Sequence, residues 1–525
     1  MKRLLRIITP FFFSSPCWGL FIDGQGSYAL RGEMSTAPGM HETSGLHQAT
    51  RHNFRFFGEL RLNDRSSFFS ELRLTPASQK SFLGDSSAAE SCTEDSCKSQ
   101  DTLNPAYTPY APQATQAYIR YASEYCILEA GRRSRHWGLG AYLNKGIDPF
   151  DVSQSLFDGM TCHVNIQKSQ TLGFSLGVDK LSETDHHLDT TLGPKPGTTN
   201  PKDDINQFFL QIEYDDRVPK AGSGTTKNVG IYLANIKAPR TELYMLDVYL
   251  GLYTSALSFQ SEALLRSGKS SDPTSFYTTG GIQIDAEHTR NTMDAIAMTS
   301  QLSYVLSSSG IQTPAGAWRT GSTQQHKIFL EATYVPGDGQ GYFQSLSSKQ
   351  TADLSDADKG LLEENIGPTN RKNHAKGVAF HENFRPTFIL FNSRDPYDDR
   401  HVSGIYHPDK VMNTTMLSAG YDFSHLDYGE FVGKVTWAQL NENVPEKVKT
   451  YWTADSTSNE LERPIGLYGP DLGTEVSLQW TYSMTPEATL SAAAAHLFTG
   501  KAWKTLPTQD PINNSLAQAS IAFRF

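Results

Sequence analysis

Long apolar runs are missing from this sequence of 525 residues. None approaches the roughly 18 consecutive apolar residues that a membrane-spanning helix needs, and the mean hydropathy is −0.44. This excludes a helical membrane protein. Charged residues are also scarce, at 19%, and the net charge is −10 without any long basic run. Nucleic acid is therefore not expected as a partner.

Cysteine is scarce as well, with five residues in the chain. Cys92 and Cys97 lie five apart in a polar, acidic stretch, which predicts a loop disulfide; a metal site is less favoured because no histidine is close by. Cys126 and Cys162 fall on the apolar faces of neighbouring strands. A simple hairpin register puts them far apart, so we expect two unpaired thiols.

Signatures of catalysis are equally thin. No serine sits in a Gly-x-Ser-x-Gly elbow, and the 15 histidines are scattered. Asp353, Asp356 and Asp358 fail the spacing of a calcium-binding EF-hand because the glycine is misplaced. We predict no enzyme, no catalytic residue, no metal ligand and no cofactor.

The N-terminus carries an export signal. Lys2, Arg3 and Arg6 precede an apolar stretch at 7–13, and small residues follow up to Gly19. This is the pattern of a secretory signal peptide over 1–19, which leaves 20–525 as the mature chain.

The C-terminal stretch alternates with a period of two. Ile521, Phe523 and Phe525 share an apolar face, whereas Ser520, Ala522 and Arg524 share the other. A final strand ending on phenylalanine resembles the closing strand of bacterial outer-membrane β-barrels. The resemblance implies that Ile521, Phe523 and Phe525 form the membrane-targeting signal read by the barrel-assembly machinery. The alternative is the last strand of an ordinary β-sandwich.

The same alternation recurs along the whole chain in runs of about ten residues, the length of a tilted membrane-spanning strand. About 20 candidate strands are found, and barrels of this type use even numbers. We predict an all-β fold: one transmembrane antiparallel up-and-down β-barrel of about 18 strands, with 16 to 20 as the range.

The breaks between strands alternate in length. Short turns occur at 63–64, 123–124, 254–255, 425–427 and 485–487, and long polar connections near 76–113, 134–158, 183–203, 306–324, 395–411 and 442–472. Short periplasmic turns and long external loops give this rhythm.

One connection, 337–383, departs from the rhythm. Its length predicts a plug or gating segment, with a solvated loop as the alternative. The strand count puts it on the periplasmic side, whereas a miscount of two strands makes it an external loop.

Charged residues of both signs occupy the polar faces of the strands. This pattern predicts that the charged side chains line a pore. The alternative interpretation is a structural ladder of charge pairs. Because both signs occur, the pattern predicts neither anion nor cation preference. The predicted pore-lining residues are Arg55, Glu59, Arg61, Glu71, Arg73, Arg120, Glu129, Arg133, Glu213 and Glu331.

Two stretches, 131–140 with Arg133 and Trp137, and 380–391 with His381 and Glu382, resemble segments of large outer-membrane barrels similar in size to alginate-export and carbohydrate porins. The resemblance covers about a tenth of the chain. The cluster at 131–140 either attracts an acidic sugar or packs through its own charges.

These features together predict a porin-like channel of the Gram-negative outer membrane for passive diffusion of small hydrophilic solutes. Its partners are outer-membrane lipid, the assembly machinery and those solutes, and no oligomeric state is predicted. The alternative is a non-channel barrel: a plugged scaffold, an adhesin-like surface protein or a barrel enzyme.

Overall fold

Alternation of the side chains along each strand organises the computed structural model. In β13, Ala295 and Ala297 are buried, whereas Ile296 and Met298 between and beyond them are 59% and 43% exposed. The structure describes residues 21–36, 47–74, 113–146, 154–165, 172–181, 206–216, 225–238, 241–270, 291–292, 294–310, 322–337, 380–381, 384, 386–391, 411–442, 466, 468–504 and 510–525.

The strands follow in chain order, in two groups. The first group is β1 (Phe21–Ser35), β2 (His47–Asn63), β3 (Ser66–Leu74), β4 (Gln113–Ala122), β5 (Ile127–Ser134), β6 (Leu156–Asn165), β7 (Leu172–Leu181) and β8 (Asn206–Asp215). The second group is β9 (Thr225–Ala238), β10 (Thr241–Thr254), β11 (Leu257–Ser270), β12 (Asn291–Thr292), β13 (Ala295–Gly310), β14 (Ser322–Val335), β15 (Thr414–His425), β16 (Gly429–Leu440), β17 (Asp471–Thr485), β18 (Ala488–Thr499) and β19 (Asn514–Arg524).

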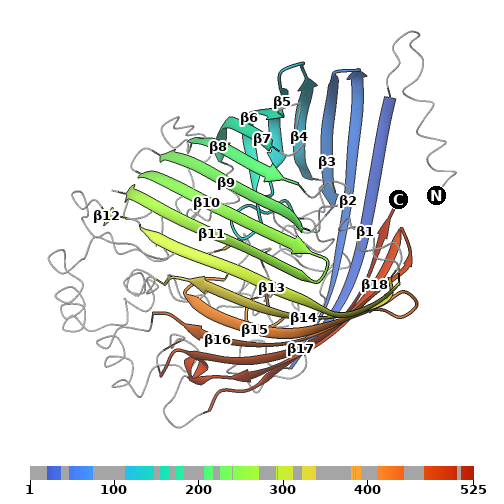
Figure 1. The fold of residues 1–525 in the computed structure, drawn as a ribbon, viewed down its shortest axis with the longest axis vertical. Coiled ribbons are helices and arrows are strands. Elements are labelled where there is room, and N and C mark those ends of the chain that lie inside the picture. Colours follow the sequence, from blue (N-terminus) through green and yellow to red (C-terminus); the bar gives the residue numbers. More distant parts are fainter. Residues whose placement is uncertain are drawn as a thin grey trace, which may run out of the picture.

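The strands close into a ring (Figure 1). Each long strand pairs antiparallel with the next, and β1 pairs with both β2 and β19. Gly26 and Phe525 exchange both backbone hydrogen bonds, at 2.6 and 2.9 Å, where the ring closes. The sheet has 19 strands, but β12 has two residues and pairs with the end of β11, so eighteen long strands form the wall. The predicted up-and-down barrel of about 18 strands is confirmed.

The apolar faces of these strands point outward. Leu176, Leu330 and Leu478 are exposed on three different strands, whereas the polar neighbours Ser175, Glu475 and Ser477 are buried. In a sandwich the apolar faces would be hidden between two sheets, so the sandwich alternative is wrong. A closed sheet with an apolar outside and a polar inside is the arrangement of a membrane barrel. Among the described residues, no helix is long and apolar enough to span a membrane.

The two ends of the barrel differ in the length of their connections. At one end lie the tight turns between β2 and β3, β4 and β5, β10 and β11, β15 and β16, and β17 and β18. The longer connections from β8 to β9 and from β13 to β14 also lie at this end, so the prediction of 306–324 as a long external loop is wrong. At the other end the connections are long, except for the two residues between β9 and β10. The predicted periplasmic position of 337–383 is wrong, because strand parity joins β14 to β15 at the end with the long connections.

Candidate functional site: the barrel lumen

The wall from β2 to β7 turns alternating arginines and carboxylates toward the lumen. The first cluster is built around Glu71 and Arg73, whose side chains form an ion pair at 2.9 Å. Gln154 donates to Glu71 at 3.1 Å, and Gln116 donates to the same carboxylate. Glu59 accepts from Arg61 at 3.2 Å and from Ser67 at 2.9 Å. The charges on this wall are thus paired rather than isolated.

A second cluster surrounds Glu129 in β5. Arg120 donates two hydrogen bonds to it, at 2.7 and 2.9 Å, from β4, while Arg133 lies 3.7 Å away along β5 itself. His163 of β6 approaches the same carboxylate at 3.5 Å. Arg120 keeps 45% of its side chain exposed, so this cluster combines a buried acid with a cation that reaches open space.

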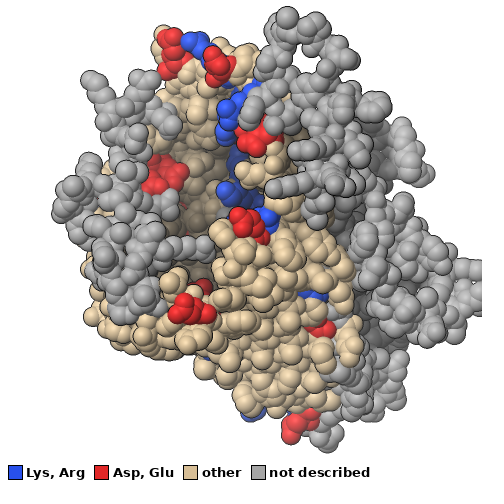
Figure 2. All heavy atoms as spheres, turned by 90° about the vertical axis from the view of Figure 1, so that its right-hand side faces the viewer, with Lys and Arg blue, Asp and Glu red and all other residues tan. Residues whose placement is uncertain are grey.

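The stretch 131–140 runs from this wall into the lumen. Arg135 pairs with the fully buried Asp179 at 2.6 Å and lies over the ring of Phe209, with 3.7 Å between its guanidinium carbon and the ring centroid. Arg133 also contacts Asp179, at 3.5 Å. These contacts favour the packing alternative for the arginines of this stretch. Figure 2 shows Lys and Arg in a column beside a recess, with Asp and Glu at its sides.

Beyond Arg135 the connection crosses to the opposite wall. Trp137 is buried against Gly230 and Tyr232 of β9, with its ring centroid 5.8 Å from that of Tyr232. The absence of a side chain at Gly230 is what admits the indole, because a Cβ there would meet its six-membered ring. Leu143 and Ala141 are buried in the same apolar cluster. The side chains of this connection thus pack like a core inside the barrel.

A buried glutamate of the wall holds the crossing segment in place. Glu262 of β11 accepts backbone hydrogen bonds from Leu139 at 2.5 Å, from Tyr142 at 3.2 Å and from Ala141 at 3.5 Å. Asp247 of β10, itself fully buried, lies close to Glu262 on the inward face of the sheet. We call the contacts of Glu262 with 139–142 the first clamp. Three backbone N–H groups thus converge on one buried carboxyl group.

A second buried glutamate repeats this arrangement across the lumen. Glu475 of β17 is 1% exposed and accepts from the backbone N–H groups of Phe388, Ile389 and Leu390, at 2.7, 2.9 and 3.3 Å. Lys434 of β16 donates to the Pro386 carbonyl beside it. We call the contacts of Glu475 with 388–390 the second clamp. It fixes part of the connection between β14 and β15 inside the barrel.

The two inward segments touch each other. The His381 N–H donates to the Ala141 carbonyl at 2.7 Å, and Phe380 and Leu390 join the apolar cluster of Trp137. On the other side, Arg55 of β2 donates to the Gly146 carbonyl at 2.6 Å. A continuous bridge of protein therefore runs from β2 through both segments to β17, and it narrows the lumen.

Burial shifts the pKa values of two side chains of the bridge toward their neutral forms. Burial, together with the Lys145 ammonium, lowers the pKa of His136, which stays neutral near pH 7. Burial raises the pKa of the Tyr142 phenol well above its ordinary value. His136 and Tyr142 are thus neutral near pH 7, whereas Lys145 of the same segment is exposed. Among the residues that the structure describes, no three His, Cys, Asp or Glu side chains gather as a metal site would require.

All ten predicted pore-lining residues lie on the inward faces of their strands. They fall into the two clusters around Glu71 and Glu129, the contact of Arg55 with Gly146, and the pair of Glu331 with Lys434 at 3.3 Å. Glu213 lies on the inward face of β8, opposite Gly230 of β9. Glu262, Asp247 and Glu475 were not among the site residues predicted from the sequence.

The predicted targeting residues lie where β19 pairs with β1 and closes the barrel. Ile521 pairs with Leu30 and Phe523 with Tyr28 in the closing ladder, while Phe525 packs over Gly26. Cys92 and Cys97, like the signal peptide at 1–19, lie outside the described residues.

Cys126 and Cys162 are free thiols, as predicted, but the reason given was wrong. The two side chains contact one another through a hydrogen bond. The long connection from β5 to β6 lets Leu128 pair with Cys162, a register that a tight hairpin would not give.

The sequence matches no family model and no curated protein. Among solved structures it is similar to Acinetobacter baumannii OccAB3, at 10% identity over 96% of this chain and all of that one, with a TM-score of 0.44. It is also similar to Pseudomonas aeruginosa OccK5 (OpdH), at 9% identity over 96% and 98% of the two chains, with a TM-score of 0.43. The outer membrane protein OprD of P. aeruginosa is similar at 10% identity over 97% and 95%, with a TM-score of 0.42.

Proposed function

We propose that the protein is a porin-like channel of the Gram-negative outer membrane that passes small hydrophilic solutes by passive diffusion. The observation that carries this proposal is the closed barrel with apolar residues outside and hydrogen-bonded charges inside. Lipid matches the outer face, and water matches the inner one. The chemistry is selection by size and charge, with no bond made or broken.

The path of the solute follows the charged wall. On the side of β9 to β18 the inward segments pack against apolar residues and leave a dry contact, exemplified by Val335, Leu440 and Leu497. On the side of β2 to β7 the charged clusters stay hydrated through partly exposed cations such as Arg120 and Arg61. The constriction is the space between this wall and the bridge formed by the two clamped segments.

The targeting signal belongs to the same proposal. Ile521, Phe523 and Phe525 lie in the strand that closes the ring against β1, and Phe523 and Phe525 are exposed on it. A final strand with free aromatic side chains supports recognition by the barrel-assembly machinery before closure.

A plugged scaffold is the second candidate, because the bridge occupies the lumen. Planar-bilayer recordings of the purified barrel separate the two. A channel gives stepwise current through single molecules, whereas a permanently plugged barrel gives none in the native protein and acquires steps only when a clamp is removed. Native protein that stays silent while E262A and E475A variants conduct would establish the scaffold and refute the channel.

Liposome swelling then tests the solute class. Vesicles that hold the barrel are expected to swell in small sugars and amino acids and to stay intact in oligosaccharides too large for the constriction. Equal swelling in all sizes would contradict a narrowed lumen.

A further inference from the structure

Two cysteines lie next to each other on the outward face of the barrel. Leu128 of β5 pairs with Cys162 of β6, and Cys126 comes two residues before Leu128. Residues two apart on an extended chain share a face, so both thiols lie on the side of Leu128. That side is outward, because the adjacent pair of the ladder, Glu129 with Thr161, is buried toward the lumen.

The two thiols are in contact and unbonded. The Cys126 and Cys162 side chains share a hydrogen bond, and both are half-buried free thiols. Cys126 lies just before β5, in a turn where its N–H donates to Ser123 Oγ at 2.9 Å. Because Cys126 is outside the ladder with β6, its side chain can close the short gap to an S–S bond of about 2.05 Å.

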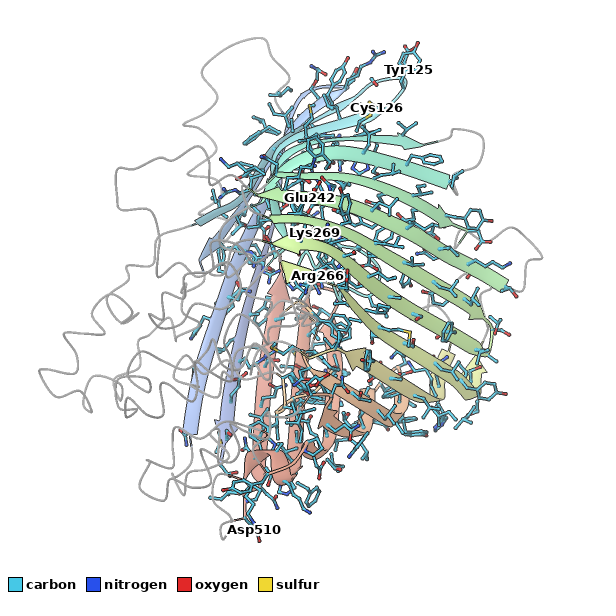
Figure 3. All side chains as sticks on the ribbon, turned by 90° about the vertical axis from the view of Figure 1, so that its left-hand side faces the viewer. Tyr125, Cys126, Glu242, Arg266, Lys269 and Asp510 are labelled. Carbon is cyan, nitrogen blue, oxygen red and sulfur yellow. The ribbon has the colours of Figure 1, made fainter. Side chains whose placement is uncertain are left out.

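The thiols also lie at the end of the barrel that meets the oxidising compartment. Figure 3 labels Cys126 beside Tyr125 at the turn between β4 and β5. Tight turns of this kind face the periplasm in outer-membrane barrels. Exported chains meet disulfide-forming enzymes there, whereas cytosolic thiols stay reduced.

We propose that Cys126 and Cys162 are an oxidation site, at which a disulfide-bearing oxidoreductase of the periplasm converts the thiol pair into an intramolecular disulfide. This rests on the export that the proposed function includes. One barrel thiolate attacks the enzyme's disulfide and forms a mixed disulfide, which releases one enzyme thiolate. The second barrel thiolate then attacks the barrel sulfur of that bond and releases the other. The barrel loses two electrons, the enzyme gains them as a dithiol, and the two barrel protons pass to the enzyme's thiolates or to water.

The crosslink would join the shortest of the long strands to its neighbour β6. β5 has eight residues, fewer than any other long strand. Its lumenal continuation is the segment held by the first clamp. A bond between Cys126 and Cys162 encloses β5, that inward segment and the start of β6 in one covalent loop. Oxidation would thus fix the strand from which the bridge begins.

Tryptic peptides allow a direct test. Cleavage after Lys and Arg leaves Cys126 in the peptide 121–132 and Cys162 in 146–168, whereas Cys92 and Cys97 share the peptide 81–98. Cells are quenched in acid, free thiols are alkylated, and the barrel is digested without reductant. Peptides 121–132 and 146–168 are expected as one linked species, lighter than the sum of the two by two hydrogens, and reductant separates them.

The C162S variant serves as the matched control, because it removes one partner and returns 121–132 as a free alkylated peptide. Purified reduced barrel treated with an oxidised dithiol is the second measurement, and its crosslink forms at a rate independent of protein concentration. Recovery of both peptides as free thiols in both experiments would overturn the proposal, as would linkage of either peptide to another chain.

Failure of this site and failure of the channel are distinguishable. The C126S/C162S variant leaves every lumen residue in place, so its conductance is expected to match that of the native barrel. A barrel that conducts without the linked peptide refutes the oxidation site alone. A linked peptide in a barrel that never conducts refutes the channel alone.

Discussion

The wall from β2 to β7 and the wall from β9 to β18 face the same lumen with different inward side chains. On the first wall, arginines and carboxylates form ion pairs with nitrogen–oxygen distances of 2.6 to 3.2 Å, as in Arg73 with Glu71 and Arg135 with Asp179. On the second wall, alanine, leucine and valine dominate the half near the long connections, and its buried glutamates bind backbone N–H groups of the inserted segments. Inward carboxylates therefore pair with arginines on the first wall, whereas the buried glutamates bind inserted backbone on the second.

The difference follows from what each wall has opposite it. An arginine can satisfy a wall carboxylate through its own fork of donors, so Arg73 and Arg120 pair with carboxylates of the same wall, although Arg55 also binds the Gly146 carbonyl of the inserted chain. Glu262 and Glu475 receive three N–H groups each from a segment that enters the lumen, so the second wall is complete only with that segment in place. Removing a contact should therefore open the lumen from the second wall and retune it from the first.

The largest effect is expected from W137A. Truncation of this buried indole removes the apolar anchor of the crossing segment and costs about 3–5 kcal/mol of packing free energy. The released segment should leave the lumen, which raises the single-channel conductance. Backbone hydrogen exchange of 135–146 should rise with it.

Its control is W503A, the same truncation at another buried tryptophan. Trp503 donates to the Leu472 carbonyl at 2.8 Å and packs near the long-connection end, away from the first clamp. This variant should lose comparable stability with native exchange at 135–146. Equal loosening of 135–146 in both variants would show that general destabilisation opens the lumen.

The second clamp gives the next effect. E475A leaves the N–H groups of Phe388, Ile389 and Leu390 buried without an acceptor, at a cost of about 3 kcal/mol. We expect a larger and noisier conductance, together with protease sensitivity near 386–391. E475Q keeps one acceptor oxygen, so its conductance and protease sensitivity should lie between those of the native protein and those of E475A.

D422N is the matched change on the same wall, because Asp422 faces inward and pairs with Lys327 rather than with inserted backbone. It should leave the protease pattern native. Cleavage near 386–391 in D422N, or its absence in E475A, would contradict the role given to Glu475.

G230A tests the fit of the indole by adding one methyl group. The new Cβ meets the ring of Trp137, and overpacking of this kind costs about 1–3 kcal/mol. Increased hydrogen exchange at 135–146 should follow, smaller than in W137A. Gly433 has open space where a Cβ would be, so G433A is the control and should leave exchange unchanged. Equal hydrogen exchange in G230A and G433A would contradict the packing of Trp137 against Gly230.

The barrel was predictable because its signal is local and repeated. A period of two recurs in each strand, and the alternation of short and long breaks favours a membrane barrel over a sandwich, which has no reason to sort its loops by length. Inward residues such as Arg120 and Glu331 follow from the same parity. Each strand thus carries its own evidence, and an error in one leaves the others intact.

The clamps were not predictable, since their partners are distant and carry no side-chain signature. Glu262 binds backbone 123 residues away, and Glu475 binds backbone 86 residues away. Every residue except proline has a backbone N–H group, so the sequence does not mark which of these groups bind a carboxyl group. The contact of Cys126 with Cys162 was missed for a related reason, because the register of β5 on β6 depends on the long connection between them.

The smallest predicted effect concerns the first wall. R120Q removes a partly exposed positive charge from the lumen while leaving the bridge in place. A unit charge 8 Å from an ion in water contributes about 0.5 kcal/mol, and screening at physiological salt reduces this to about 0.2 kcal/mol. Because the sign is opposite for cations and anions, the cation-to-anion permeability ratio should rise about twofold. Reversal potentials in a salt gradient measure this ratio, and the shift should fade at high ionic strength, where charges are screened.

The matched variant is R132Q on the outward face. Arg132 has 43% of its side chain exposed and pairs with Asp158 at 2.6 Å, so it loses the same charge from a similar setting on the opposite side of the sheet. Because the protein wall separates that charge from the path, the permeability ratio should stay native. A shift of equal size in R120Q and R132Q would mean that ions do not pass along the wall from β2 to β7. The contrast between the two walls would then describe packing alone.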